Sequence, residues 1–228
     1  MKINVQKSKE RGITKLDWLL SKHSFSFNTY YNPKRMNFGK LIVLNDDIVN
    51  PNSGFGMHNH ENMEIISIVL EGSLKHNDDQ GNSGLIHSNE VQIMSAGTGI
   101  THSEYNPSKK DKVHFLQIWI EPKKLDIRPS YKQKLIPDTK DKFILIVDKK
   151  VINQNAFLYL GNFKDKKNLN YKLNNSKNGV FILIIKGKIK IENKILEDGD
   201  SAEITDVNNI GIEILQESKV LLIEVPNR

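Results

Sequence analysis

The sequence GMHNH at residues 56–60 carries two histidines, His58 and His60, separated by one residue. A second stretch, HSEY at residues 102–105, repeats that spacing with His102 and Glu104. On a β-strand, residues two apart point to the same face. Two such strands lying side by side would bring three imidazoles and one carboxylate to one point, which is a ligand set for a divalent first-row metal ion.

The rest of the chain has the pattern of an all-β protein. Short apolar runs alternate with turns rich in Gly, Asn and Asp, and no long stretch has helical periodicity. The strands predicted in the first half are Gly39–Asn45, Gly56–His60, Met63–Leu70, Leu74–Asp78, Val91–Ser95, Ile100–Tyr105 and Val113–Ile120. Those predicted in the second half are Phe143–Val147, Ala156–Phe163, Val180–Lys186, Lys188–Glu192, Ser201–Ile204, Ile210–Leu215 and Val220–Val225.

Two polar segments interrupt these runs. Residues 121–141 are charged and contain three spaced prolines, which predicts a linker between two β units. Residues 164–178 are rich in Lys and Asn and are predicted to form an exposed loop. The sequence LEGSLK at 70–75 resembles IKGKIK at 185–190, each with a turn glycine between two strands. The two halves are therefore interpreted as similar β-barrels in tandem.

Length and composition fit a folded protein of one large or two ordinary domains. The chain has 228 residues, of which 38% are hydrophobic. Its apolar runs fall short of the 18 or so residues that would predict a membrane span, and the first residues lack the apolar core of a signal peptide. Because cysteine is absent, a disulfide framework is excluded, and a cytoplasmic protein is the simplest interpretation.

The charge pattern argues against nucleic acid as a partner. The net charge is +6, but only four of the basic residues are arginine, the residue preferred for bidentate recognition of bases and phosphates. The histidines are distributed unevenly, since all seven lie before residue 115. Any imidazole chemistry therefore belongs to the N-terminal half.

Simpler interpretations of these residues remain open at this point. The first pair could be two surface histidines, and Glu104 a carboxylate that faces solvent. Glu64 has the same strand parity as the first pair and is a rival fourth ligand. His76 and His87 flank a polar turn and are predicted to lie at the surface or rim. His114 alternates with apolar residues and is predicted to join their packing face.

Longer motifs resemble the cupin superfamily and, within it, the pirin family. They are HSFSF at 23–27, NDD at 45–47, GFGMHNH at 54–60, MEI at 63–65, EG at 71–72, QIMSAGTGITHSEYNP at 92–107 and QIWI at 117–120. This resemblance implies an all-β fold of two tandem cupin-type β-barrels, a bicupin. Residues 1–130 would form the barrel that holds the metal, and residues 131–228 a degenerate barrel without metal ligands.

The resemblance also implies a ligand set. Carried over by motif, the ligands are His58, His60, His102 and Glu104, and Glu64 is left with a supporting or structural role. The cofactor would be one divalent transition metal ion, which could be Fe, Mn, Co, Ni, Cu or Zn. These residues do not fill six coordination positions, so open positions would remain for substrate or oxygen.

Bacterial pirin-like proteins of this kind are similar to quercetin 2,3-dioxygenases. The implied reaction opens the central ring of a flavonol such as quercetin with dioxygen and releases carbon monoxide. Glu104 is the candidate catalytic residue, acting as general base on the flavonol 3-hydroxyl. A flat polyphenol needs an apolar slot, and the candidate lining residues are Phe55, Met94, Phe115, Gln117 and Trp119.

A second hypothesis comes from another class of protein. Some pirins look like non-enzymatic, metal-binding regulators that bind a transcription-associated protein partner. In that case the surface of the barrel would carry the function in place of its pocket. A third hypothesis is a metal-binding barrel that has lost its activity.

Overall fold

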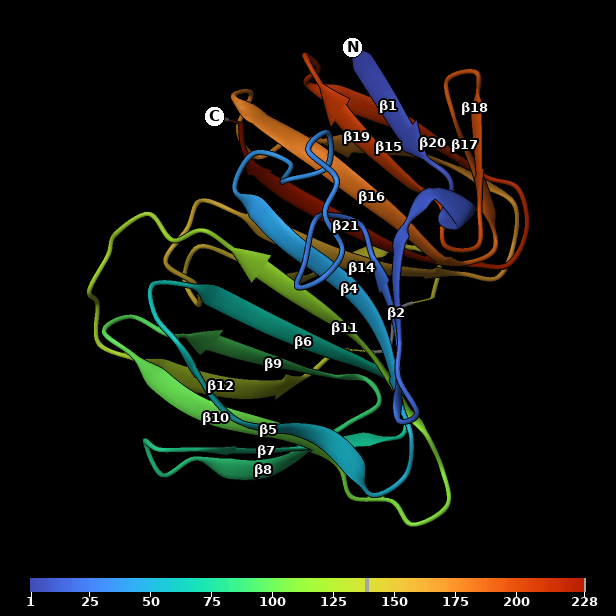
Figure 1. Ribbon diagram of the computed structural model, residues 1–228. Helices are drawn as coiled ribbons and strands as arrows, with labels where there is room; N and C mark the ends of the chain where they lie inside the picture. The colour runs from blue at the N-terminus through green and yellow to red at the C-terminus, as the bar shows by residue number, and fades with distance from the viewer. Residues whose placement is uncertain (138–139, 228) are drawn as a thin grey trace.

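The structure, a computed structural model, describes residues 1–137 and 140–227 and is built almost entirely of antiparallel strands (Figure 1). The first unit has a seven-stranded sheet in the order β12 (Ser130–Leu135), β9 (Glu90–Ser95), β6 (Glu64–Glu71), β11 (Val113–Ile120), β4 (Leu41–Val49), β3 (Leu19–His23) and β2 (Gly12–Lys15). Its second sheet has the order β5 (Ser53–His60), β10 (Ile100–Asn106), β7 (Ser73–Asp78) and β8 (Ser83–His87).

The second unit repeats this plan with fewer strands. Its larger sheet has the order β1 (Lys2–Gln6), β19 (Ser201–Thr205), β16 (Asn178–Lys186), β21 (Ser218–Pro226), β14 (Phe157–Phe163) and β13 (Phe143–Val147). The smaller sheet has the order β15 (Lys167–Lys172), β20 (Asn209–Ile214), β17 (Lys188–Ile191) and β18 (Lys194–Glu197). A short 3-10 turn, η1 (Ser8–Glu10), follows β1. The predicted all-β fold of two cupin-type barrels is confirmed.

The larger sheets of the two units share one hydrophobic core. Alternation along β11 sends Leu116 and Ile118 to the outer face of the first barrel, where they join one buried cluster with residues of β16 and β21. Phe181 of β16 lies in this cluster with its ring centroid 5.6 Å from that of Phe25 and 6.2 Å from that of Phe38. The N-terminal half therefore supplies part of the core around the C-terminal half.

The interiors of the two barrels differ in chemistry. In the second barrel, apolar side chains of β16, β17 and β20 fill the space between the sheets, among them Ile182, Ile189 and Ile212. In the first barrel, buried polar residues occupy much of the interior face, as with His102 and Glu104 of β10. Because buried polar groups need partners to offset their lost hydration, the first interior is the one organised around a site.

Two strands belong to a different unit from the one that their position in the sequence suggests. The first strand, β1, pairs with β19 at the edge of the second unit, and in Figure 1 it lies in dark blue beside the orange and red strands. Strand β12 falls inside the predicted linker at 121–141 and pairs with β9 of the first unit. Residues 138 and 139 of that linker lie outside the described residues, and the domain boundary at residue 130 stays a prediction.

The exposed loop predicted at residues 164–178 is wrong. Residues Lys167–Lys172 form β15, which pairs with β20 along its whole length. The alternation of inward and outward side chains covers only six residues, but Tyr171 faces the core of the second barrel and is 7% exposed. The lysines and asparagines between the inward residues hid this strand, because they face solvent. Between residues 1 and 137 and between 140 and 227, no helix is long and apolar enough to cross a membrane.

The shared core predicts that both units depend on Phe181. Truncation in the variant Phe181→Ala removes a fully buried ring and leaves a cavity, so we expect a loss of about 3–5 kcal/mol in the free energy of unfolding, measured by urea denaturation. Ile195→Ala, at a residue that is 46% exposed, is the control and should change that free energy by less than about 0.5 kcal/mol. Equal effects of the two substitutions would contradict the shared core.

Candidate metal centre

The pairing of β5 with β10 brings the two histidine-containing stretches together. His58 lies directly opposite His102 in this antiparallel pair. A β-bulge follows, because β5 has one more residue than β10 between this pair and the next, in which Phe55 lies opposite Glu104. The extra residue lets Phe55 and His58 share the interior face although they are three positions apart.

Three imidazoles converge at this point. The ligand nitrogens of His58, His60 and His102 all lie within 4.8 Å of one another. The ring centroids of His58 and His102 are 4.4 Å apart, and those of His60 and His102 are 5.0 Å apart. The structure therefore brings together the three histidines that the spacing singled out.

Each of these histidines has a nitrogen available for a metal. His58 Nδ1 donates to the backbone oxygen of Gly56 at 2.7 Å, which leaves its Nε2 as the bare nitrogen. His60 Nε2 and His102 Nε2 are buried and have no hydrogen-bond partner among the described residues. A buried, unpaired nitrogen is costly, and metal coordination would satisfy both atoms. The residues present therefore fit a divalent transition metal ion.

Burial also keeps two of these imidazoles neutral. Burial, with a smaller contribution from the nearby His58, lowers the pKa of His60 to about 4. Burial lowers the pKa of His102 to about 2, with smaller contributions from the surrounding imidazoles. Because a metal binds the neutral form of histidine, these rings are ready to coordinate at neutral pH.

Glu104 lies on the same interior face but outside the group of three. Its carboxylate accepts hydrogen bonds from Ser67 Oγ at 3.0 Å and from Gln117 Nε2 at 2.6 Å. Burial raises the pKa of Glu104 to about 7, although both hydrogen bonds act to lower it. Its role as a fourth ligand or as a general base stays a prediction. A carboxyl group with this pKa can accept or release a proton near neutral pH.

The rival ligand Glu64 faces elsewhere. It accepts hydrogen bonds from Ser95 Oγ at 2.6 Å and from the backbone N–H of Asn153 at 3.1 Å, and the second of these ties the first unit to the second. This contact is structural. His114 also lies away from the three histidines, since its Nε2 contacts Asp46 Oδ1 at 2.6 Å, and it shares the strand face of Leu116 as predicted.

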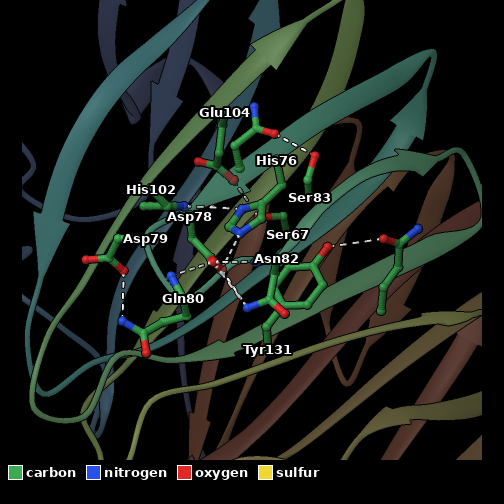
Figure 2. A network of polar contacts seen from close by, with 12 residues as sticks. Ser67, His76, Asp78, Asp79, Gln80, Asn82, Ser83, His102, Glu104 and Tyr131 are labelled. Carbon is green, nitrogen blue, oxygen red and sulfur yellow. Dashed lines mark hydrogen bonds and ion pairs between the residues drawn. The ribbon is translucent and has the colours of Figure 1, made fainter.

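His76 is a residue of the site region that sequence reasoning missed. The sequence predicts it at the surface or rim, but it is fully buried beside His102 (Figure 2). His87, for which the same position is predicted, is exposed. Its Nε2 is 2.9 Å from Asp78 Oδ2, and its Nδ1 is 3.4 Å from His102 Nδ1. Pairing of β7 with β10 creates this contact, and strand spacing in the sequence gives no signal for it.

An apolar cavity of about 210 Å³ opens onto His58 and Glu104. Of the predicted lining residues, Phe55, Gln117 and Trp119 are on its wall. The other two, Met94 and Phe115, have fully buried side chains in separate hydrophobic clusters and do not line it. Parity correctly placed Phe115 on the inward face, but this end of the barrel is filled by packed side chains.

Side chains between residues 14 and 28, from the β2–β3 hairpin and the segment after it, supply a large part of the cavity wall, and the sequence analysis did not predict this. Trp18 meets Phe55 edge to face with centroids 5.1 Å apart, and Phe27 meets Trp119 in the same way at 5.4 Å. The motif HSFSF at residues 23–27 was the available signal, but it carried no indication of its location. The cavity therefore lies between this N-terminal segment and strands β4, β5, β10 and β11 of the same unit.

Asp47 is a second buried carboxyl group on the cavity wall. It is 3% exposed, and its Oδ1 has no hydrogen-bond partner within the part of the chain that is described. Burial raises the pKa of Asp47 from 3.8 to about 7, with a smaller contribution from Glu104. The folded protein therefore keeps this proton at pH values where the unfolded chain releases it.

Two antiparallel barrels, with a candidate metal site in the first, place this chain in the class of two-barrel cupins. The chain belongs to the pirin family: residues 4–120 match the pirin family model, and residues 148–225 match a quercetinase C-terminal cupin domain.

Relatives match over nearly the whole chain. It is 37% identical to a quercetin 2,3-dioxygenase of Escherichia coli (strain K12), over 98% of this chain and 99% of that one. It is 36% identical to a pirin-like protein of Caulobacter vibrioides, over 91% and 92% of the two chains. The structure of the bacterial pirin YhhW of Escherichia coli in complex with nickel(II) superposes with a TM-score of 0.95 at 36% identity, covering all of both chains.

The raised pKa of Asp47 predicts a pH-dependent stability for the metal-free protein. Because the unfolded chain binds fewer protons at this site than the folded one, the free energy of unfolding should fall as pH rises from 3.8 to about 7. Asp47→Asn removes this dependence, so the difference between native and variant should change steadily across that window in urea denaturation. Asp17→Asn, at an exposed carboxyl group, is the control, and its free energy of unfolding should change with pH in the same way as that of the native protein. The same pH dependence in Asp47→Asn would contradict the prediction.

Proposed function

We propose that this protein is a metal-dependent dioxygenase that opens the central ring of a flavonol such as quercetin with release of carbon monoxide. The observation that carries the proposal is the convergence of three bare imidazole nitrogens beside a buried carboxyl group and an aromatic-walled cavity. Relatives named quercetin 2,3-dioxygenase, at 37% identity over nearly the full chain, support the reaction class.

The metal would be held by His58, His60 and His102, with Glu104 as the proposed fourth ligand. Nitrogen and oxygen donors without thiolate suit a divalent transition metal, and nickel(II) is bound by the related pirin YhhW. When bound, such an ion supplies Lewis acidity, which favours the ionised form of a substrate hydroxyl.

The protein's own groups have three tasks in this proposal. Glu104 takes the proton of the flavonol 3-hydroxyl as general base, and in this role its carboxylate would no longer be a ligand of the metal. Ser67 and Gln117 hold its carboxylate in place through their hydrogen bonds. Trp119 and Phe55 offer flat apolar surfaces that orient the substrate rings and exclude water from the reacting centre.

Metal content is the first test. Protein expressed without a His tag should contain close to one divalent transition metal ion per chain, measured by elemental analysis. His60→Ala and His102→Ala each remove one of the converging nitrogens and should lower this content severalfold or more. His87→Ala, at an exposed histidine, should leave it unchanged. A metal content near zero in the native protein would contradict both the dioxygenase hypothesis and the metal-binding regulator hypothesis.

Turnover is the second test. The metal-loaded protein, incubated with quercetin under air, should bleach the visible absorbance of the flavonol. Chelation of the metal or the substitution His58→Ala should abolish this activity, because each removes the proposed cofactor, whereas His87→Ala should retain it. A metal-loaded protein that turns over no flavonol with Fe, Mn, Co, Ni, Cu or Zn would contradict the proposed enzyme. Capture of a transcription-associated protein by that same sample would favour the regulator.

A further inference from the structure

A chain of three side chains leads from the β7–β8 turn to the metal centre. Strand β7 pairs with β10 so that Asp78 lies opposite His102 and His76 lies opposite Glu104. Asp78 Oδ2 is 2.9 Å from His76 Nε2, and His76 Nδ1 is 3.4 Å from His102 Nδ1 (Figure 2). His76 is fully buried, so water does not compete for either of its nitrogens.

The hydrogens in this chain can be placed by elimination. An ionised carboxylate only accepts hydrogen bonds, so His76 Nε2 carries a hydrogen and donates it to Asp78. In the neutral ring the other nitrogen, Nδ1, is then an acceptor. His102 Nδ1 must therefore carry a hydrogen and donate it to His76. This leaves His102 Nε2 bare, which is the buried atom without a partner among the described residues.

We infer that Asp78, acting through His76, fixes the tautomer and orientation of His102 so that its Nε2 faces the metal. Both are positioning residues. Histidine ligands of metals commonly donate their second N–H to a carboxylate or backbone carbonyl. His58 follows that rule through Gly56, whereas His102 uses a second imidazole between itself and the carboxylate. The inference rests on the proposed metal site, and it is independent of the substrate.

The surroundings hold this relay rigidly. Asp78 accepts hydrogen bonds from the backbone N–H groups of Gln80 at 3.0 Å and Asn82 at 2.9 Å, and from the Asn82 amide, so the turn itself orients the carboxylate. The ring of Tyr131 stacks on His76 with centroids 4.6 Å apart and an interplanar angle of 26°. Tyr131 belongs to β12, so this strand contributes a side chain that packs against the relay.

His76 does not serve as a metal ligand itself in this arrangement. One of its nitrogens faces Asp78 and the other faces His102. A substitution of His76 therefore tests the Asp78–His76–His102 relay without removing a proposed metal ligand. His76→Phe keeps a flat ring against Tyr131 but removes both nitrogens. His76→Gln replaces them with an amide oxygen that can accept from His102 and an amide N–H that can donate to Asp78.

The test is the nickel(II) dissociation constant of the full-length protein, measured by competition with a chelator. We expect His76→Phe to weaken binding about 10- to 100-fold and His76→Gln to restore most of that loss. His87→Phe, a histidine-to-phenylalanine change on the neighbouring strand, should match the native protein. Unchanged affinity in His76→Phe would overturn the inference, as would equal losses in the Phe and Gln variants.

A spectroscopic measurement on the native chain does not depend on the stability of any variant. In the metal-free protein, ¹⁵N spectra of the histidine rings should show His102 with its hydrogen on Nδ1 and a bare Nε2. A hydrogen on Nε2 would overturn the inference. Failure of the native protein to bind nickel(II) would overturn both the metal site and the relay. Nickel binding without quercetin turnover would overturn the proposed reaction alone.

Discussion

The register between β5 and β10 is the constraint on which the candidate metal centre depends. A slip of one residue would turn every donor of one strand to the opposite face. The bulge in β5 adds a second condition, since it places Phe55 and His58 on one face despite their odd spacing. Strand β5 lies at the edge of its sheet, and β10 is held on its other side by β7, which carries His76.

The two barrels divide stability and chemistry between them. The first holds carboxyl groups, imidazoles and amides in its interior, and each of these must find a partner to offset lost hydration. The second fills the corresponding space with isoleucine, leucine and valine, and its larger sheet packs on the first through the core around Phe181.

Sequence spacing predicted the part of the site that lies along single strands. The alternation of β10 placed His102 and Glu104 inside, and the parity of β11 placed Gln117 and Trp119 on the cavity wall. It did not predict contacts made across sheets or from distant segments. His76 enters through strand pairing, and the cavity wall near Trp18 comes from the connection between β2 and β3. Strand parity also does not indicate which end of the interior is filled by packed side chains. The burial of Phe115 away from the cavity therefore could not be predicted from it.

The placement of β1 has a consequence for how the chain is made. This strand is synthesised long before its partner β19, which begins at Ser201, and Asn4 Nδ2 donates to a Glu203 carboxylate oxygen 199 positions away. The edge of the second sheet therefore stays open until β19 has been synthesised, and β1 remains unpaired until then. Such long-range closure slows folding and leaves an edge exposed to other chains. The same pairing ties residues 2–6 to residues 201–205, so a nick between the two barrels would not separate them.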